Sequence, residues 1–297
     1  MRAAHVPPPP VPAAPPAIGA VVPFRAAAGR GRLPVERLRI GMPHLGGSGA
    51  LSEGWALRRA AHLHWQSIAA RTGMPISALR DADGRRALPS IVSAHFTGEP
   101  GAFAEDDEAL VTQTRPPAPE GGWRSRMLVR RAGGPTVRID LASRFARRDG
   151  PSNRELGAAA MPPALRPAPA DRLPGGARAL KARWASLRAA APDAPPHVTL
   201  PVERADLNGV GLLYFASFVR FFAIAEAAAA APVPLPPLRS REVHWYGNAD
   251  AGDALDLSVE LRADAPGAAP TLTTTTAARR RSDGALVAVA ETRRGGT

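Results

Sequence analysis

Apolar and polar residues alternate with a period of two along several stretches of the chain, which indicates antiparallel strands with one buried and one solvated face. In Trp123–Arg131 the odd positions are mostly apolar and the even positions carry three arginines, and Val137–Phe145 repeats the pattern. Asp283 and Gly284 supply a hairpin turn between the last two strands. The predicted strands are Ala87–Thr97, Ala109–Arg115, Trp123–Arg131, Val137–Phe145, Arg239–Gly247, Ala254–Arg262, Thr271–Arg279 and Ala285–Arg293.

Two helices are also predicted, and each follows a strand-like segment and a glycine-containing turn. Val35–Leu45 leads into a Gly-Gly-Ser-Gly turn, after which Ser52 is suited to cap a helix over Glu53–Arg71. In the second case a polar turn precedes a helix that contains four phenylalanines within Phe215–Phe222. A helix that is apolar nearly all round is a buried helix. Arg220 within it favours a soluble core helix over a membrane span.

Strand, glycine-containing turn, buried helix and four antiparallel strands thus occur twice, about 160 residues apart. This internal duplication predicts an α+β protein with a double hot-dog fold, in which each central helix is wrapped by its own antiparallel sheet. An ordinary α+β core helix after a glycine-rich turn is the alternative. The expected divisions are a disordered Pro/Ala-rich extension (1–33), a first half (34–148), a linker with a short helix at Ala177–Ala190 (149–196) and a second half (197–297).

Composition narrows the function classes. The 297 residues contain no cysteine, which excludes disulfides, thiolate nucleophiles and Cys-ligated zinc. The net charge of +12 favours acidic partners, such as the phosphates of coenzyme A or an acyl carrier protein, although it is also compatible with solvated arginines. No basic run is interleaved with aromatic residues, so nucleic acid is not expected. The chain shows neither a signal-peptide pattern nor an expected membrane span, and we expect a cytoplasmic protein.

Three stretches form a recognisable pattern: Arg39–Trp55 (RIGMPHLGGSGALSEGW) with the following Leu-His-Trp, Phe145–Arg148 with Asn153, and Asp206–Phe218 (DLNGVGLLYFASF). Together they resemble the LnmK-type proteins, named after the acyltransferase/decarboxylase of leinamycin biosynthesis. The resemblance covers most of the chain from residue 39 to residue 293. It implies a double hot-dog fold and a role in natural-product biosynthesis. The founding activity decarboxylates a methylmalonyl thioester of coenzyme A and delivers a propionyl group to an acyl carrier protein.

The sequence departs from this family at the residue linked to its chemistry. The resemblance implies a tyrosine on an early strand of the first half, in the stretch Arg85–Ile91 and most closely at Leu88. That stretch contains no tyrosine, and the chain has only Tyr214 and Tyr246. The resemblance therefore supports the fold more strongly than the reaction.

Candidate site residues follow from what a thioester reaction requires. Amides at a helix N-terminus can hold the thioester carbonyl, and an imidazole or carboxylate beside it can activate water or move a proton. A simple capped turn is the alternative in the first half, and an Asx-type turn in the second. The predicted catalytic residues are His44, Asp206 and Asn208, and the predicted substrate-binding residues are Gly46, Gly47, Ser48, Ser52, Tyr214, Arg147 and Arg148.

Two function hypotheses remain open. One is an enzyme that acts on an acyl thioester of coenzyme A or of an acyl carrier protein, and the other is a non-catalytic double hot-dog that binds the carrier protein or its acyl cargo. His62 and His64 lie on different helical faces, and no H-E-x-x-H motif occurs, so no metal is predicted. We expect no tightly bound cofactor, with a coenzyme A or phosphopantetheine thioester as the substrate. The chain is a candidate for homodimer formation.

Overall fold

The computed structural model describes residues 35–116, 122–162, 165, 176–263 and 271–295. The predicted extension, residues 1–33, lies outside the described part of the chain. Residues 163–164 and 166–175 of the predicted linker also lie outside it. No helix within the described ranges is long and apolar enough to cross a membrane.

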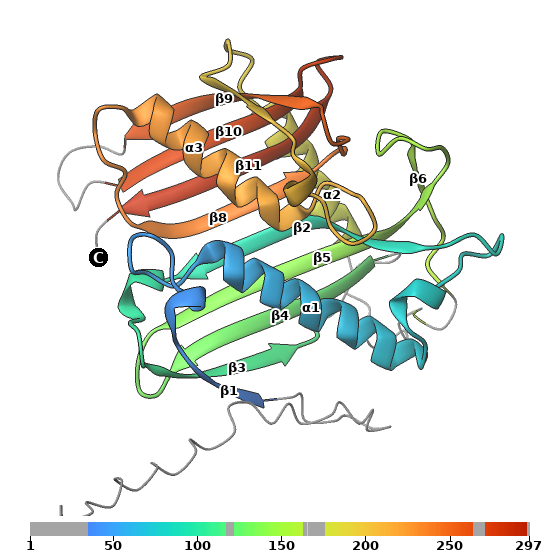
Figure 1. The fold of residues 1–297 in the computed structure, drawn as a ribbon, viewed down its shortest axis with the longest axis horizontal. Helices are drawn as coiled ribbons and strands as arrows, with labels where there is room; N and C mark the ends of the chain where they lie inside the picture. The colour runs from blue at the N-terminus through green and yellow to red at the C-terminus, as the bar shows by residue number, and fades with distance from the viewer. Residues whose placement is uncertain (1–34, 117–121, 163–164, 166–175, 264–270, 296–297) are drawn as a thin grey trace, which may run out of the picture.

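The described residues form one large antiparallel sheet of 11 strands with few helices (Figure 1). Strand order across the sheet is β1-β3-β4-β5-β2-β8-β11-β10-β9-β7, and the short β6 pairs with β5. The strands of the first half are β1 (Val35–Arg39), β2 (Leu88–Gly98), β3 (Glu108–Thr114), β4 (Gly122–Arg131) and β5 (Thr136–Arg148). The later strands are β6 (Leu156–Ala158), β7 (Val198–Pro201), β8 (Leu238–Trp245), β9 (Ala254–Ala263), β10 (Thr271–Arg280) and β11 (Leu286–Gly295).

Strands β2 and β8 meet at the centre of the sheet, and we call their line of contact the seam. Outward from the seam, the first half runs β5, β4, β3, β1, and the second half runs β11, β10, β9, β7. Each half therefore arranges its five strands in the same order relative to the sequence. The seam pairs run from Ser93 opposite His244 to Thr97 opposite Ser240.

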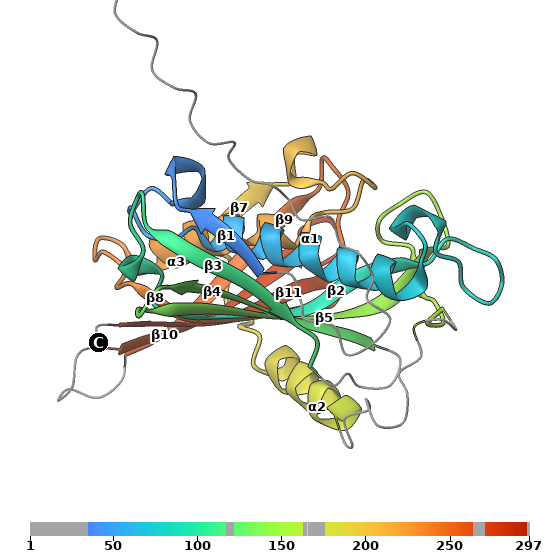
Figure 2. The same ribbon diagram turned by 90° about the horizontal axis from the view of Figure 1, so that it is seen from below.

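Helices α1 (Glu53–Thr72) and α3 (Phe218–Ala230) lie on one face of the sheet, and α2 (Gly176–Ala189) lies on the other (Figure 2). The helix predicted at Glu53–Arg71 is confirmed. Ser52 caps its start, and Gly73, whose φ of +66° suits glycine, ends it. The phenylalanine-rich helix is 13 residues long, because its first turn, Phe215–Ser217, is a 3₁₀ turn.

The predicted strands agree with the observed ones to within a few residues, with one shortening and one addition. The strand expected over Val35–Leu45 ends at Arg39, because Met42–His44 forms a 3₁₀ turn with Pro43 in it. The predicted linker contains β6 in addition to its helix. That helix is no mere connector, since Leu187 of α2 is buried and Arg183 binds Glu242 of β8 at 2.8 Å.

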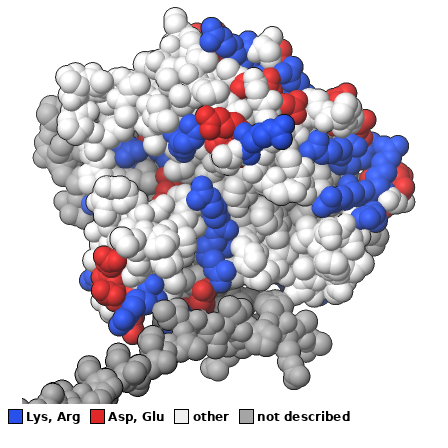
Figure 3. All heavy atoms as spheres, in the orientation of Figure 1, with Lys and Arg blue, Asp and Glu red and all other residues white. Residues whose placement is uncertain are grey.

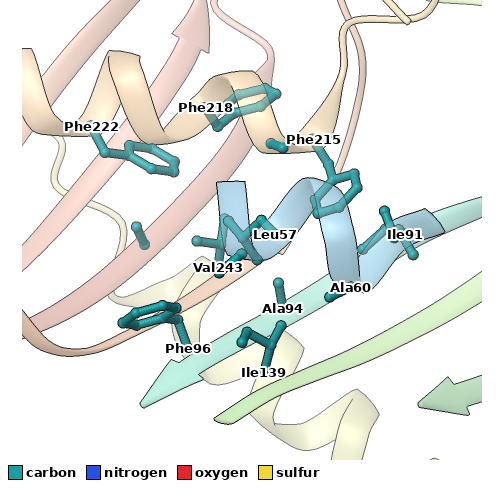
Figure 4. Packing of buried hydrophobic residues seen from close by; sticks show 14 of the residues in the cluster. Leu57, Ala60, Ile91, Ala94, Phe96, Ile139, Phe215, Phe218, Phe222 and Val243 are labelled. Atoms are coloured by element: carbon teal, nitrogen blue, oxygen red, sulfur yellow. The ribbon is translucent and has the colours of Figure 1, made fainter. Parts of the chain in front are cut away.

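One hydrophobic core extends across the seam (Figure 4). Side chains of α1 and α3 pack onto the same face of β2, β5 and β8, and a smaller cluster around Ile68, Trp123 and Phe145 lies within the first half. Burial of these side chains stabilises the fold by about 1.5–3 kcal/mol for each large residue. The labelled members are Leu57, Ala60, Ile91, Ala94, Phe96, Ile139, Phe215, Phe218, Phe222 and Val243.

A buried ionic cluster also joins the halves near the start of α1. Arg241 on β8 donates to Glu226 of α3 at 2.8 Å and to Glu53 of α1 at 2.5 Å. Arg294 and Thr292 donate to the same Glu226 carboxylate at 2.8 and 2.7 Å. Burial raises the pKa of Glu226, but the two arginines outweigh this and hold the pKa below its ordinary value. Removing one partner of such a buried pair costs about 3–5 kcal/mol.

His64, on the sheet side of α1, is also fully buried. Its Nδ1 lies 2.7 Å from Ser125 Oγ on β4, and its Nε2 lies 2.9 Å from Ser143 Oγ on β5. Burial lowers the pKa of His64 to about 3, so the imidazole is neutral in the folded protein. Its two ring nitrogens are satisfied by serines, which is a structural arrangement and not a metal site.

This buried imidazole makes a specific pH dependence testable. Between pH 6.5 and about 3 the unfolded chain binds a proton that folded His64 excludes, so stability must fall as the pH falls. We expect the wild type to lose about 1.4 kcal/mol per pH unit relative to His64→Asn in this range, measured by urea unfolding at several pH values. His62→Asn, on the exposed side of the same helix, should retain most of the wild-type slope. Identical slopes for the wild type and His64→Asn would contradict a neutral buried histidine.

Candidate functional site

The candidate site is a cavity where the two central strands part. Strand β8 ends at Trp245, whereas β2 begins at Leu88, five residues before its first partner on β8. A cavity of about 550 Å³ lies between these β2 residues, which pair with β5 but not with β8, and the segment that follows β8. Its volume is within the usual range for small-molecule sites.

Both faces of the sheet contribute walls to this cavity. Trp65 of α1 and the loop that leads into α3 line it on the face that carries α1 and α3. Trp184 of α2 and Tyr246 line it on the face that carries α2. Most of the lining is apolar or aromatic, a surface suited to an acyl or aromatic group. Apolar side chains in the wall include Leu88, Ile91, Phe145, Leu213, Phe215 and Trp245.

The loops that precede α1 and α3 have the same backbone arrangement. Asn208 N donates to Leu212 O at 2.8 Å, as Gly46 N donates to Ala50 O at 2.8 Å. A glycine with a left-handed backbone, at φ +75° or +76°, occupies the matching position in each loop. The two loops therefore correspond residue by residue, with His44 at the place of Asp206 and Ser52 at the place of Tyr214.

Asp206 and His44, the predicted acid–base residues, form hydrogen bonds within their own turns and do not line the cavity. Asp206 Oδ2 accepts from Glu203 N at 3.0 Å and from Arg220 Nη2 at 2.7 Å, and its side chain is buried. His44 Nδ1 accepts from Gly41 N at 2.9 Å, and its ring packs edge-on against a tryptophan. Catalytic roles for both residues stay predictions that these positions do not favour.

The remaining first-loop residues lie outside the cavity as well. Ser52 Oγ accepts from the backbone N–H of Trp55 at 3.2 Å, as an ordinary N-cap does. Beyond this cap, the space near the start of α1 is occupied by the buried ionic cluster around Arg241. The predicted site residues of the loop before α1 and those of the loop before α3 therefore do not meet in one cavity. Gly46, Gly47 and Ser48 are exposed on the surface of their loop.

Asn208 and Tyr214 are the predicted site residues that do line the cavity. Asn208 Oδ1 accepts from Val210 N and Leu212 N at 3.1 Å each, so the side chain shapes the loop. The Tyr214 ring lies 6.2 Å from the Trp65 ring. Burial raises the pKa of Tyr214 to about 12, although the nearby cationic Arg58 opposes this. Its hydroxyl is therefore protonated at neutral pH and can act as a donor.

Arg147 and Arg148, predicted to bind substrate, are engaged elsewhere. Arg147 pairs with Asp149 at 2.8 Å, and Arg148 donates to the carbonyl of Val210 at 2.9 Å, which holds the α3 loop in place. Neither side chain lines the cavity. On the face that carries α1 and α3, basic side chains form separate patches among acidic ones (Figure 3). The arginines that do line the cavity are Arg86, Arg144 and Arg154.

Sequence reasoning missed three residues that shape the site. Asn153 is buried, and its Nδ2 donates to Gly211 O at 2.7 Å and to Ala249 O at 2.9 Å, tying three loops together. Trp245 and Trp184 place their indole rings at the cavity from opposite faces of the sheet. Asn153 carried a signal, since it belongs to the LnmK-type resemblance, but the two tryptophans lay in a predicted strand and in the predicted linker helix without any motif.

No aspartate, glutamate or histidine lines the cavity among the residues that the structure describes. The polar groups present are amides, tyrosine hydroxyls, indole N–H groups, a serine and guanidinium groups. These groups can donate hydrogen bonds to a carbonyl or an oxyanion and bind phosphate. A side chain that could take a proton from water at neutral pH is not among them.

Comparisons with known proteins identify the fold. No protein-family model matches the sequence, and no curated protein matches it. An acyl-ACP thioesterase from Bacteroides thetaiotaomicron is similar in structure, with a TM-score of 0.58 and 10% identity over 88% of this chain and 96% of that one. The 12:0-ACP thioesterase from Umbellularia californica gives a TM-score of 0.62 and 13% identity over 89% and 94%. The chain thus has the hot-dog-like fold of these proteins.

The position of Asp206 yields a direct test of its role. Asp206→Asn keeps an acceptor for Glu203 N but loses the charge that faces Arg220, so we expect a loss of about 1 kcal/mol in unfolding free energy. Binding of an environment-sensitive apolar fluorophore in the cavity should change less than twofold. Arg220→Gln removes the same ion pair and should match it in both measurements. Unchanged stability with a tenfold loss of binding would place Asp206 in the ligand site.

Proposed function

We propose that the chain binds acyl thioesters of coenzyme A or of an acyl carrier protein in the cavity at the seam and acts on them in natural-product biosynthesis. The carrying observation is an aromatic-walled cavity of about 550 Å³ with arginines at its edge. The apolar wall suits an acyl group, and guanidinium groups suit the phosphates that both carriers share. The net charge of +12 attracts such anions at longer range.

The architecture that we propose is a tandem pair of hot-dog units, over residues 34–148 and 197–297. Three observations support it: the matching strand order of the halves, the position of α1 and α3 on one face, and the equivalent loops before these helices. The structural similarity to two acyl-ACP thioesterases supports action on an acyl thioester. Membership of the LnmK-type family remains part of this proposal, as does formation of a homodimer.

The chemistry of the lining favours decarboxylation over hydrolysis. Hydrolysis needs a base to activate water, and no carboxylate or imidazole lines the described part of the cavity. Decarboxylation releases carbon dioxide and moves the electron pair of the broken C–C bond onto the thioester carbonyl, as an enolate that donors can stabilise. A proton must then return to carbon. Tyr214, protonated at neutral pH, is the residue that we assign to this step.

A non-catalytic binder is the second candidate, and one observation favours it. Leu88 lies in the cavity wall, where the resemblance places the tyrosine of the family. Leucine can neither donate to an enolate nor transfer a proton. Tyr214 reaches the same cavity from the second half, and whether it replaces the missing hydroxyl decides between the two candidates.

Turnover of defined thioesters tests the proposal. The full-length protein is incubated with acyl-CoA and acyl-carrier substrates, including methylmalonyl thioesters, and the acyl masses are followed. We expect conversion of methylmalonyl to propionyl or its transfer, with little free acid. Tyr214→Phe should lower kcat by about 10²-fold or more while substrate affinity changes only a few-fold.

The outcomes separate the two candidates. Binding without turnover of any substrate would support the non-catalytic candidate. Rapid release of free acids would contradict the assigned reaction class. Absence of binding to every acyl-CoA and acyl-carrier substrate would overturn the proposed function. Thermal unfolding of Tyr214→Phe serves as the control that its fold is intact.

A further inference from the structure

Two indole N–H groups at the cavity are buried and lack a hydrogen-bond acceptor. They belong to Trp184 and Trp245, and they are the unpaired buried donors, among the described residues, that line this cavity. Trp245 is only 8% exposed. Buried donors are nearly always satisfied, so two unpaired donors in residues that line a cavity call for acceptors that the described residues do not supply.

The two indoles mark different depths of the site. Trp245 packs edge-on against Phe215 and Phe218, on the face that carries α1 and α3. Trp184 stacks on Tyr246 at 5.0 Å, and Tyr246 Oη donates to Trp184 O at 2.8 Å, on the face that carries α2. Consecutive residues of an extended strand point to opposite faces, which is why residues 245 and 246 serve different walls. The two unpaired indole donors therefore lie on opposite faces of the sheet, so one ligand that reaches both must extend along the seam.

Two arginines of the cavity wall are unpaired, and one of them points to the face that carries α2. Arg144 and Arg86 line the cavity, are exposed and have no carboxylate partner among the described residues. By contrast, Arg154 in the same wall is paired with Asp253. The neighbour of Arg144 on β5, Phe145, is buried in the core that faces α1, so Arg144 points to the other face, where α2 lies.

We infer that the thioester threads the seam from one face of the sheet to the other. Its acyl group lies against Trp65, Ile91 and Phe215, on the face that carries α1 and α3. The thioester carbonyl accepts from Trp245 Nε1, and an amide carbonyl of the pantetheine arm accepts from Trp184 Nε1. The phosphate of the arm binds Arg144 on the α2 side, and Arg86 is the second unpaired arginine of the cavity wall that can contact it.

This orientation rests on the proposed function and makes it more specific. It assigns carrier recognition to Arg144 and Arg86 in place of Arg147 and Arg148, which already have partners. It also gives α2 a functional position, because the helix supplies the donor that the pantetheine arm needs. The recognised chemistry is a phosphopantetheine arm, whether it belongs to coenzyme A or to a carrier protein.

Ligands of graded length test the orientation. The same acyl group is offered as a coenzyme A thioester, as a phosphopantetheine thioester and as an N-acetylcysteamine thioester, which has no phosphate. Dissociation constants are measured by calorimetry. Arg144→Gln should weaken the two phosphate-containing ligands about tenfold and change the N-acetylcysteamine thioester less than twofold. Raising the salt concentration should act on the ligands in the same order.

The indole variants complete the test. Trp245→Phe keeps an aromatic ring but removes the donor, so it should weaken all three ligands about tenfold. Trp184→Phe should weaken the two ligands that carry the full arm more than the truncated one. Arg130→Gln, an exposed arginine of β4 outside the cavity, is the matched control and should leave all affinities unchanged. Thermal unfolding checks that each variant is folded.

Distinct results separate failure of the orientation from failure of the function. Equal losses for all ligands in Arg144→Gln, or no loss for any, would overturn the orientation while acyl-thioester binding stands. Wild-type protein that binds none of the three ligands would overturn the proposed function and the orientation together. A loss for the coenzyme A thioester alone would assign Arg144 to the nucleotide phosphates of coenzyme A and would overturn its assignment to the phosphate of the arm.

Discussion

The antiparallel pairing of β2 with β8 is the interaction on which the rest of the molecule depends. Five residue pairs, from Ser93–His244 to Thr97–Ser240, turn two five-stranded halves into one sheet. Because the sheet is continuous, α1 and α3 can share one core across its centre. The pairing is also short. It stops before the first residues of β2 are covered, and the cavity forms in the space left there.

The loops at the two ends of the seam have equivalent backbones, but the space beside them is closed by charged side chains at one end and open at the other. Near the start of α1, Glu53, Glu226 and Arg241 form a buried ionic cluster that closes the space and ties the halves together. Near the start of α3, aromatic side chains and Tyr214 surround an open cavity. The two matching loops therefore border one closed end and one open end of the seam. The difference arises from side chains, since the loop hydrogen bonds are the same in both.

The binding end combines an apolar wall, orphan donors and unpaired arginines without a side-chain base. Such a combination suits the ligand that we propose, which has an apolar acyl group, amide and thioester carbonyls, and a phosphate. It leaves water without an activating group, which shapes the reaction that we propose. α2 belongs to this site rather than to a passive linker, because Trp184 forms part of its wall.

By itself, the sequence determined the local elements. Period-two alternation placed β4 and β5 nearly residue by residue, and the glycine-containing turns located both loops, because these signals depend on neighbours in the chain. Asn208, predicted as catalytic, and Tyr214, predicted to bind substrate, both line the cavity, and their roles stay predictions. The roles of Asp206, His44 and Arg147 could not be read in this way, since each depends on which group lies beside it after folding. Only the tertiary structure decided where the seam ends, how α2 docks and that Trp184 and Trp245 meet at one cavity, because long-range strand register and packing across the sheet bring together residues that no local pattern connects.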